Sequence, residues 1–366
     1  MEVMKILQLA HGRIIPQYFS GYSKRCHDIF KGEERHLISI GGPFFFDRKE
    51  NYAEQYRSLL LTIFSFLKGN RSFEIFIARG KYIREKFYRR VNSLINESDI
   101  IVFEGPWLYN IFRNKIKGKF IVYDAHNVEY LLRKNNPFQE EVRKLEGDLV
   151  KNADLIFAVT KEDMDAFKDI YSLNDDKIYY VPIQIELKEY LWNGKNSKDI
   201  IFIGSLYEPN ILALKEIERI AENLHEFNFH IIGSLNRYPK RKKIPNVIYH
   251  GTISENEKDR ILNNSFLALN PVLIGAGRNV KMLDYISHGL PVLTTSIGLR
   301  GFERKDLENL VFVDEIENFV KRIKEIDMER EKLVNISKKL YEYFVEMHKK
   351  ETEIKPIEII KKRIKI

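Results

Sequence analysis

The chain has 366 residues, of which 44% are hydrophobic and 31% charged, and it carries a formal net charge of +8. This balance is typical of a globular protein of about two domains, and no run approaches about 18 uncharged apolar residues, so we expect no transmembrane helix. The single cysteine, Cys26, excludes an internal disulfide and a multi-cysteine zinc site. Together with an N-terminus that lacks the apolar core of a signal peptide, it predicts a cytoplasmic protein.

The positive net charge permits an anionic partner such as a nucleotide, a nucleic acid or a lipid surface. A charge-rich, solvated surface is the alternative interpretation, because abundant Lys, Glu, Ile and Tyr are also found in thermophile proteins. The sequence contains no signature of a nucleic-acid-binding module, so we expect no nucleic-acid partner.

The first half alternates short apolar strands with helical segments. We expect strands at 3–9, 36–40, 73–77, 100–104, 120–124, 155–159 and 178–181. We expect helices at 23–30, 52–67, 79–95, 140–152 and 161–171. Short, wholly apolar strands that alternate with helices predict a parallel sheet covered on both faces.

The second half repeats this pattern after a polar, irregular linker at 188–197. Strands are expected at 200–203, 229–232, 247–250, 267–271, 291–295 and 311–313, and helices at 210–224, 255–263, 280–288, 318–324 and 329–348. The fold class is therefore α/β, with two Rossmann-like domains at 1–187 and 198–345 whose parallel sheets face a cleft. Residues 346–366 form a basic tail, and packing of this tail on the N-terminal domain is one arrangement left open. Ligands of such folds bind beyond the carboxyl ends of the strands.

A small-residue turn at 275–279 separates one expected strand from the helix at 280–288. The free backbone N–H groups at such a helix start favour a phosphate. Arg278 and Lys281 add positive charge there, and Asp284 follows one turn later. The order G-x-G-x-x-K-x-x-D is neither a dinucleotide fingerprint nor a Walker A loop.

Three further strands of the second half end in a glycine and a small polar residue: Gly204-Ser205, Gly233-Ser234 and Gly251-Thr252. Together with the turn at 275–279 they predict one nucleotide pocket lined by backbone groups. The alternative for each glycine is that it only terminates its strand.

The segments FIGSLYEPN, NVIYHGTIS and GAGRNVKMLDYISHGLPVLTTSIGLRG resemble the nucleotide-sugar domain of GT-B glycosyltransferases of the large retaining family 4. In the first half, VYDAHNVEY, KNADLIFAVTKED and KIYYVP resemble the acceptor domain of the same family. The resemblance implies that a sugar passes from a nucleotide-diphosphate donor to a glycan, lipid-linked or other acceptor with retained anomeric configuration. It also implies no obligatory metal and no covalently held cofactor.

The resemblance assigns the donor contacts residue by residue. The second acid of the family's acidic motif, which holds the ribose hydroxyls, corresponds to Asp284, whereas the first falls on Ala276. Arg278 and Lys281 are the expected cations for the leaving diphosphate. The full expected donor set is Gly21, Gly204, Ser205, Gly233, Thr252, Ile253, Gly275, Ala276, Gly277, Arg278, Asn279, Val280, Lys281 and Asp284.

His126, which follows an expected strand, resembles the family's histidine near the donor sugar. Its implied role is to hydrogen-bond the sugar and orient the acceptor, and general-base catalysis is the alternative. The other residues expected on the acceptor side are Tyr22, Lys24, Arg25, Glu104 and Asn127. Gly21 would allow a close backbone approach.

Residues 71–90 interleave basic and aromatic side chains. Such a stretch could lie on an anionic membrane at the inner face of the cell, which would suit a lipid-linked acceptor; a solvated helix is the alternative. Two other functions stay open. They are a GT-B epimerase or phosphorylase, and a catalytically silent protein that binds a sugar nucleotide or a glycan.

Overall fold

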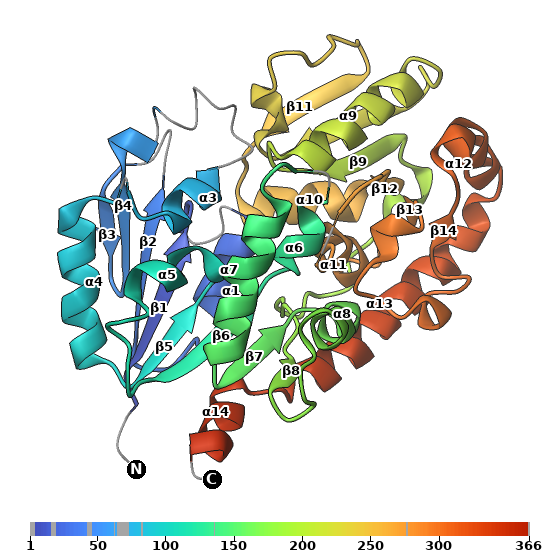
Figure 1. The fold of residues 1–366 in the computed structure, drawn as a ribbon. Coiled ribbons are helices and arrows are strands. Elements are labelled where there is room, and N and C mark those ends of the chain that lie inside the picture. Colours follow the sequence, from blue (N-terminus) through green and yellow to red (C-terminus); the bar gives the residue numbers. More distant parts are fainter. Residues whose placement is uncertain are drawn as a thin grey trace. The chain divides into compact units, whose positions relative to one another are not determined.

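A computed structural model describes residues 4–15, 20–41, 46–61, 63, 73–81, 83–134, 136–275 and 277–364 of the chain. The chain divides into two compact units (Figure 1). Unit 1 comprises Met1–Gln184 together with Ile354–Ile366, and unit 2 comprises Ile185–Glu353. Each unit contains one sheet that is parallel throughout, apart from one short antiparallel strand in unit 1. The predicted α/β class with two parallel-sheet domains is confirmed.

Unit 1 has an eight-stranded sheet in the order β3-β4-β2-β1-β5-β6-β7-β8. Its strands are β1 (Ile6–His11), β2 (Arg35–Gly41), β3 (Arg48–Glu50), β4 (Ala53–Arg57), β5 (Ile100–Phe103), β6 (Phe120–Ala125), β7 (Leu155–Ala158) and β8 (Ile178–Tyr180). Its α-helices are α1 (Gly21–Asp28), α3 (Phe73–Ala78), α4 (Glu85–Glu97), α5 (Tyr109–Phe112), α6 (Glu129–Leu132), α7 (Gln139–Asn152), α8 (Lys161–Tyr171) and α14 (Pro356–Ile364). A 3₁₀ turn, η1 (Pro106–Leu108), follows β5.

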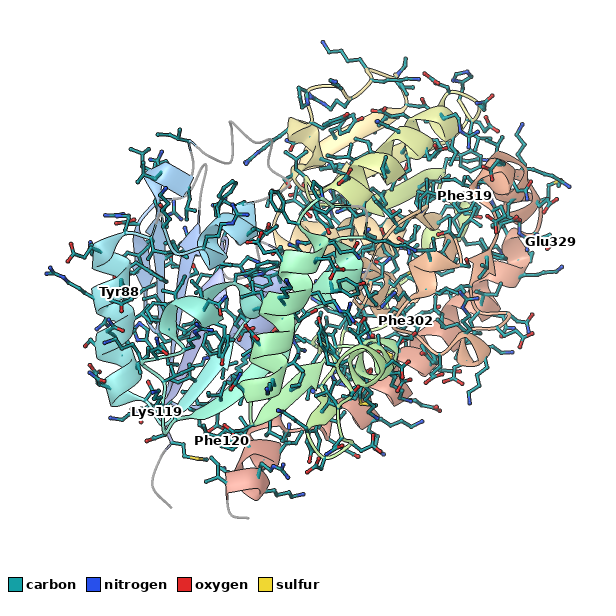
Figure 2. All side chains as sticks on the ribbon, viewed as in Figure 1. Tyr88, Lys119, Phe120, Phe302, Phe319 and Glu329 are labelled. Atoms are coloured by element: carbon teal, nitrogen blue, oxygen red, sulfur yellow. The ribbon has the colours of Figure 1, made fainter. Side chains whose placement is uncertain are left out.

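The helices of unit 1 cover a sheet that is apolar on both faces, as the sequence pattern predicts. Helix α4, for example, buries Phe87 and Val91, and its Tyr88 stacks on Phe112 with ring centroids 5.4 Å apart. Figure 2 labels Tyr88 on this helix. This packing fixes the strands whose carboxyl ends carry the polar residues described below.

Two expectations for unit 1 are wrong. Residues 53–57, expected within a helix, form strand β4, which pairs in parallel with β2. The buried Glu54 of this strand is neutralised by Arg90, at 2.8 Å. Residues 73–77, expected as a strand, lie in helix α3, because a short apolar run fits a buried helix as well as a strand.

Unit 2 has a six-stranded parallel sheet in the order β11-β10-β9-β12-β13-β14. Its strands are β9 (Asp199–Ile203), β10 (Asn228–Ile232), β11 (Val247–Gly251), β12 (Leu267–Asn270), β13 (Val292–Thr294) and β14 (Phe312–Val313). Its α-helices are α9 (Glu208–Ala221), α10 (Glu255–Asn264), α11 (Val280–Ser287), α12 (Phe319–Met328) and α13 (Arg330–Thr352). Its 3₁₀ turns are η2 (Gly194–Asn196), η3 (Ser234–Arg237), η4 (Ile297–Leu299), η5 (Arg304–Asp306) and η6 (Ile316–Asn318).

Helix α11, which follows the small-residue turn, begins at the predicted residue and packs its apolar side inward. Leu283 and Ile286 are fully buried, and Gly289 ends the helix with a positive φ of 64°. No helix within the described part of the chain combines the length and the apolar character needed to cross a membrane.

Candidate active site

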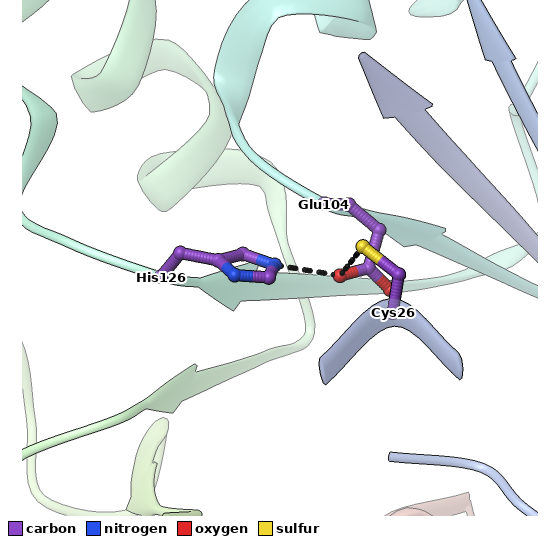
Figure 3. Close-up of side chains that lie close together, drawn as sticks. All are labelled: Cys26, Glu104 and His126. Carbon is purple, nitrogen blue, oxygen red and sulfur yellow. Dashed lines mark hydrogen bonds and ion pairs between the residues drawn. The ribbon is translucent and has the colours of Figure 1, made fainter. Parts of the chain in front are cut away.

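The first polar cluster lies at the carboxyl ends of the central strands of unit 1. Glu104 directly follows β5 and His126 directly follows β6, and these neighbouring strands bring the two side chains together. His126 Nε2 lies 2.8 Å from Glu104 Oε2, and Cys26 of helix α1 donates to the same oxygen at 3.5 Å (Figure 3). The sequence predicted Glu104 and His126 for one site, and the structure places them in contact.

A buried ion pair between Arg25 and Asp124 lies next to this cluster. Arg25 donates to both carboxylate oxygens of Asp124, and its Nη1 donates to the carbonyl of Val181 at 2.8 Å. Both charged side chains are nearly inaccessible, at 2% and 0% exposure. Burial raises the pKa of Asp124 to about 6, although Arg25 opposes this shift. The expectation that Arg25 contacts an acceptor is therefore wrong, because its guanidinium holds the core of unit 1 together.

Aromatic side chains line the cluster. Tyr22 lies against His126 with ring centroids 4.4 Å apart and ring planes tilted by 40°, and its hydroxyl donates to the Glu104 carbonyl at 3.0 Å. The same hydroxyl lies 3.0 Å from Nδ1 of His11, whose ring meets Trp107 edge-on. Burial lowers the pKa of His11 and of His126 to about 4, so both imidazoles are neutral near pH 7. The sequence analysis missed His11 and Trp107, although both flank strand ends as Glu104 and His126 do.

The remaining residues predicted for the acceptor side occupy the start of α1 and the loop after β6. Gly21 is the first residue of α1, which Ser20 caps by accepting from Ser23 N at 3.2 Å. Lys24 forms an ion pair with Asp28 within the helix, and both side chains are about one-fifth exposed. Asn127 bonds the carboxylate of Glu129 at the start of α6. Of the residues predicted for the acceptor side, Tyr22, Glu104 and His126 belong to the buried cluster.

Cys26, Glu104 and His126 also present the donor set of a transition-metal site. Their ligand atoms lie within 4.8 Å of one another. Each atom is nevertheless engaged in hydrogen bonds inside the cluster, and burial raises the pKa of the Cys26 thiol well above its usual value, which disfavours the thiolate that a metal needs. The arrangement is satisfied without an ion.

The second candidate site lies at the carboxyl ends of β9, β10 and β11 in unit 2. The backbone closes tightly there, since Gly233 N donates to the Gly251 carbonyl at 2.7 Å and Gly204 N donates to the Ile232 carbonyl at 2.9 Å. A Cβ atom at Gly233, where φ is 106°, would lie 2.3 Å from the Gly204 carbonyl oxygen. Glycine is thus required here for backbone approach and not only to end a strand.

Ser205, Thr252 and Ile253 follow these strands at the same edge of the sheet. Ser205 offers its carbonyl to the side chain of Asn210, in the first turn of α9, at 3.0 Å. Thr252 is exposed and Ile253 is half-buried, directly after β11. The predicted small-residue junctions therefore share one edge of the unit 2 sheet.

Lys281 reaches this same edge from helix α11. Its Nζ donates to Asn210 Oδ1 at 2.8 Å and lies 4.8 Å from the centroid of the Phe202 ring. No carboxylate pairs with it among the described residues. Burial alone lowers the pKa of the Lys281 ammonium to about 7. A desolvated cation without an anionic partner is poised to receive one.

The turn before α11 leaves the start of this helix open. Gly277 has a positive φ of 67°, and Asn279 occupies the N-cap position without capping the helix by its side chain. Instead, Asn279 Nδ2 donates to Asn270 Oδ1 at 3.2 Å. The first N–H groups of α11, from Val280 onward, are therefore not capped by a side chain. Gly275 is exposed, and Ala276 lies outside the described residues.

Asp284, one turn into α11, is about one-fifth exposed and forms an ion pair with Lys258 of α10 at 3.0 Å. Lys258 also contacts Glu255, and Asp284 is the larger of the two charge effects that raise the pKa of Lys258. Within the described part of the chain, Lys258 contacts Oδ1 of Asp284, and the second carboxylate oxygen can accept from a hydroxyl donor.

The prediction that Arg278 faces a diphosphate is wrong. Its side chain is 1% exposed and forms an ion pair at 2.8 Å with Glu351 of helix α13. The guanidinium carbon also lies 4.9 Å from the ring centroid of Phe302, which Figure 2 labels. This cation anchors the turn to the core of unit 2, and Lys281 remains the predicted cation that faces the sheet edge.

The basic stretch at 71–90 is largely neutralised. Four of its five arginines pair with carboxylates, as Arg79–Glu141, Arg84–Asp47, Arg89–Glu85 and Arg90–Glu54. Residues 71, 72 and 82 lie outside the described part of the chain. These arginines do not provide a surplus of charge for an anionic membrane.

Residues 197–326 match the family described as Glycosyl transferases group 1. The match falls in unit 2 and contains β9 to β14 together with Lys281 and Asp284. A curated relative, an uncharacterised 44.6 kDa protein in the cps region of Klebsiella pneumoniae, is 24% identical over 268 residues, which are 66% of this chain and 68% of that protein. The predicted resemblance to this group of glycosyltransferases is confirmed.

Two solved structures show the same fold. HepE from Anabaena, in complex with UDP-glucose, has a TM-score of 0.66 at 12% identity, and the match covers 96% of this chain and 98% of HepE. WaaG, a glycosyltransferase involved in lipopolysaccharide biosynthesis, has a TM-score of 0.63 at 13% identity, covering 93% and 95%. The chain thus has the predicted GT-B fold, and its residues 197–326 match a glycosyltransferase family.

Proposed function

We propose that this chain transfers a sugar from a nucleotide-diphosphate sugar to a glycan or lipid-linked acceptor, with retention of anomeric configuration. Unit 2 binds the nucleotide, with the diphosphate at Lys281 and the start of α11 and the ribose at Asp284. In unit 1, His126 hydrogen-bonds the sugar. We further propose a cytoplasmic enzyme, which the single free thiol of Cys26 favours.

The observation that carries this proposal is the environment of Lys281. The ammonium is desolvated, lacks a carboxylate partner among the described residues and adjoins an open helix start at the carboxyl edge of a parallel sheet. A diphosphate would supply the missing negative charge and accept from the backbone N–H groups. Neutralising the leaving diphosphate is also the main demand of transfer without a metal.

The similar structures suggest which donor and acceptor to test first. HepE was crystallised with UDP-glucose, and WaaG acts in lipopolysaccharide biosynthesis, so a UDP-sugar donor and a surface-glycan acceptor are the first candidates. Because Arg278 is buried against Glu351, Lys281 is the one cation of the predicted pair left for the diphosphate, and we assign its remaining contacts to the backbone N–H groups of α11.

Isothermal calorimetry with UDP-, GDP- and ADP-sugars tests the donor site. Loss of the charged hydrogen bond in K281A should weaken binding of the preferred donor by about 10- to 100-fold. The control is K242A, since Lys242 pairs with Glu222 on the surface of the same unit. Equal affinities for wild type and K281A would refute the assignment of the diphosphate to this edge.

Turnover separates the proposed enzyme from the alternatives. The donor is incubated with a membrane extract, and the release of nucleoside diphosphate and the labelled product are measured. Transfer with a product of retained configuration supports the proposal. Donor binding without transfer or hydrolysis indicates the silent binding protein, and conversion of the sugar without transfer indicates an epimerase.

A further inference from the structure

Glu104 is a buried carboxylate that the side chains of Gln8, Cys26 and His126 contact. Gln8 Nε2 donates to Oε1 at 2.7 Å, and Cys26 Sγ and His126 Nε2 approach Oε2 at 3.5 and 2.8 Å. The side chain of Glu104 is inaccessible to solvent and that of His126 is 8% exposed. A carboxylate that receives donors on both oxygens is held in one position.

Gln8 fixes which oxygen of Glu104 must accept. The Gln8 amide nitrogen also donates to the Cys26 carbonyl at 2.8 Å, and a carbonyl only accepts. The amide therefore cannot turn over, and Oε1 of Glu104 must remain an acceptor. A proton shared by Glu104 must therefore lie at Oε2, which is the oxygen that His126 Nε2 contacts.

A second carboxylate favours the proton on the imidazole. Asp124 Oδ2 lies 3.5 Å from the same Nε2 atom of His126. Nε2 thus faces two carboxylates, whereas Nδ1 has no hydrogen-bond partner among the described residues. Tyr22 lies against the imidazole with its ring plane tilted by 40°.

We propose that Glu104 is a positioning residue that keeps the His126 proton on Nε2, so that Nδ1 is a hydrogen-bond acceptor for a hydroxyl of the bound sugar. This inference rests on the proposed function, because it assigns the partner of Nδ1. In this arrangement His126 accepts a hydrogen bond from a hydroxyl of the sugar, and Glu104 does not contact the substrate. A sugar that lacks this hydroxyl would leave Nδ1 unpaired and bind less productively.

The substitution E104Q has a defined consequence. Because Gln8 can only donate, the oxygen of the new amide must face Gln8, and its NH₂ group must face His126. The imidazole would then accept at Nε2 and carry its proton on Nδ1. The double variant with Gln8→Met removes the constraint from Gln8, lets the amide rotate and should restore the original tautomer.

The tautomer can be measured on the ligand-free, full-length protein. Long-range ¹H–¹⁵N correlation spectra of ¹⁵N-histidine-labelled protein report the protonated nitrogen of each of the nine histidines, and H126N identifies the signal of interest. We expect Nε2–H in the wild type and in C26A, which removes only the thiol donor, and Nδ1–H in E104Q. A wild-type Nδ1–H tautomer would overturn the inference. So would a stoichiometric divalent metal in the purified protein that is lost in C26A, since Nε2 would then be a metal ligand.

Activity supplies the second readout. E104Q should lower kcat/KM by about 10²-fold with little change in donor affinity, and Gln8→Met in the E104Q background should recover part of it. A tautomer change without a change in kcat/KM would overturn the role in transfer. If no variant transfers sugar, the proposed function fails, whereas the tautomer result still stands or falls by itself.

Discussion

At the scale of single residues, the charge of Lys281 is the property most open to experiment. Burial lowers the pKa of the ammonium to about 7, and its described hydrogen-bond partner, Asn210, carries no charge. The helix start beside it disfavours a cation further. A bound diphosphate would reverse both effects, so binding should raise the pKa of Lys281.

This coupling gives donor binding a predictable pH dependence. Below about pH 7 the free lysine is already charged and affinity is constant. Above this pH, binding requires uptake of a proton, so affinity should fall by up to about tenfold per pH unit until the pH reaches the pKa of the bound state.

Calorimetry of the preferred nucleotide sugar at several pH values, in buffers of different ionisation enthalpy, measures that proton uptake. We expect close to one proton per donor at pH 8 and none at pH 6. K281M should bind weakly at every pH and show no uptake. Proton uptake that persists in K281M would mean that another group carries the dependence.

The two arginines that the sequence analysis misassigned share one physical cause. Arg25 and Arg278 stand beside glycine-containing turns, where bases commonly meet anions. Their partners, Asp124 and Glu351, lie 99 and 73 residues away. A buried ion pair of that span leaves no local signal, so the sequence could predict the positions of both bases but not the direction in which they point.

At the scale of elements, the loop that carries His126 is held by a carboxylate on α7. Glu146 accepts from the backbone N–H groups of Glu129 and Tyr130, at 2.9 and 3.2 Å. It also accepts from the hydroxyls of Tyr123 and Tyr171, each at 2.8 Å. The start of α6, three residues after His126, is thus tied to α7.

Removing this acceptor should loosen the loop and destabilise unit 1. E146A leaves four donors without their partner, and each unsatisfied buried group costs about 1–3 kcal/mol, partly relieved by water. We expect a loss of about 3 kcal/mol or more in the free energy of unfolding, measured with denaturant. Amide hydrogen exchange should accelerate most in the segment around α6.

The matched control is E140A on the same helix, because the Glu140 side chain is 68% exposed. It should change stability by less than about 0.5 kcal/mol. A similar small effect for E146A would show that the loop does not depend on Glu146.

Most strands of both sheets could be predicted from sequence, because each is a short apolar run bounded by a turn. Strand β4 could not, since its Glu54 and Gln55 are polar and are buried only through pairing with β2 and through the distant Arg90. The segment of helix α3 was predicted as a strand because it is apolar, and three consecutive buried residues fit a strand as well as a helix. In the candidate site, strand ends predicted Glu104 and His126, whereas Gln8, in the middle of β1, is identified only by its contacts with Glu104 and Cys26.

At the scale of the whole molecule, unit 1 is assembled from both ends of the chain. Helix α14 returns after unit 2 and inserts Ile360, which is fully buried, into a cluster with Ile6, Val102 and Phe157 of the sheet. Arg363 of the same helix pairs with Asp176 at 3.1 Å. The last segment is therefore part of the core of unit 1, and its removal should destabilise unit 1.

Two of the isoleucines of α14, Ile360 and Ile364, allow this to be tested by a matched pair of substitutions. Ile360 is 0% exposed and Ile364 is 45% exposed on one helix, so they differ in burial but hardly in chemistry. I360A should lower the free energy of unfolding by about 2–5 kcal/mol through lost burial and the cavity left behind, whereas I364A should change it by less than about 0.5 kcal/mol.

Denaturant unfolding, followed by pulse proteolysis with fragments assigned by mass spectrometry, gives the stability of each unit. In I360A the loss of stability should appear in fragments of unit 1. These fragments should include strands that lie more than 200 residues from α14 in sequence, because Ile360 packs in one cluster with their side chains. Equal effects of the two substitutions would mean that α14 merely rests on the surface, and the chain would then fold without its C-terminal segment.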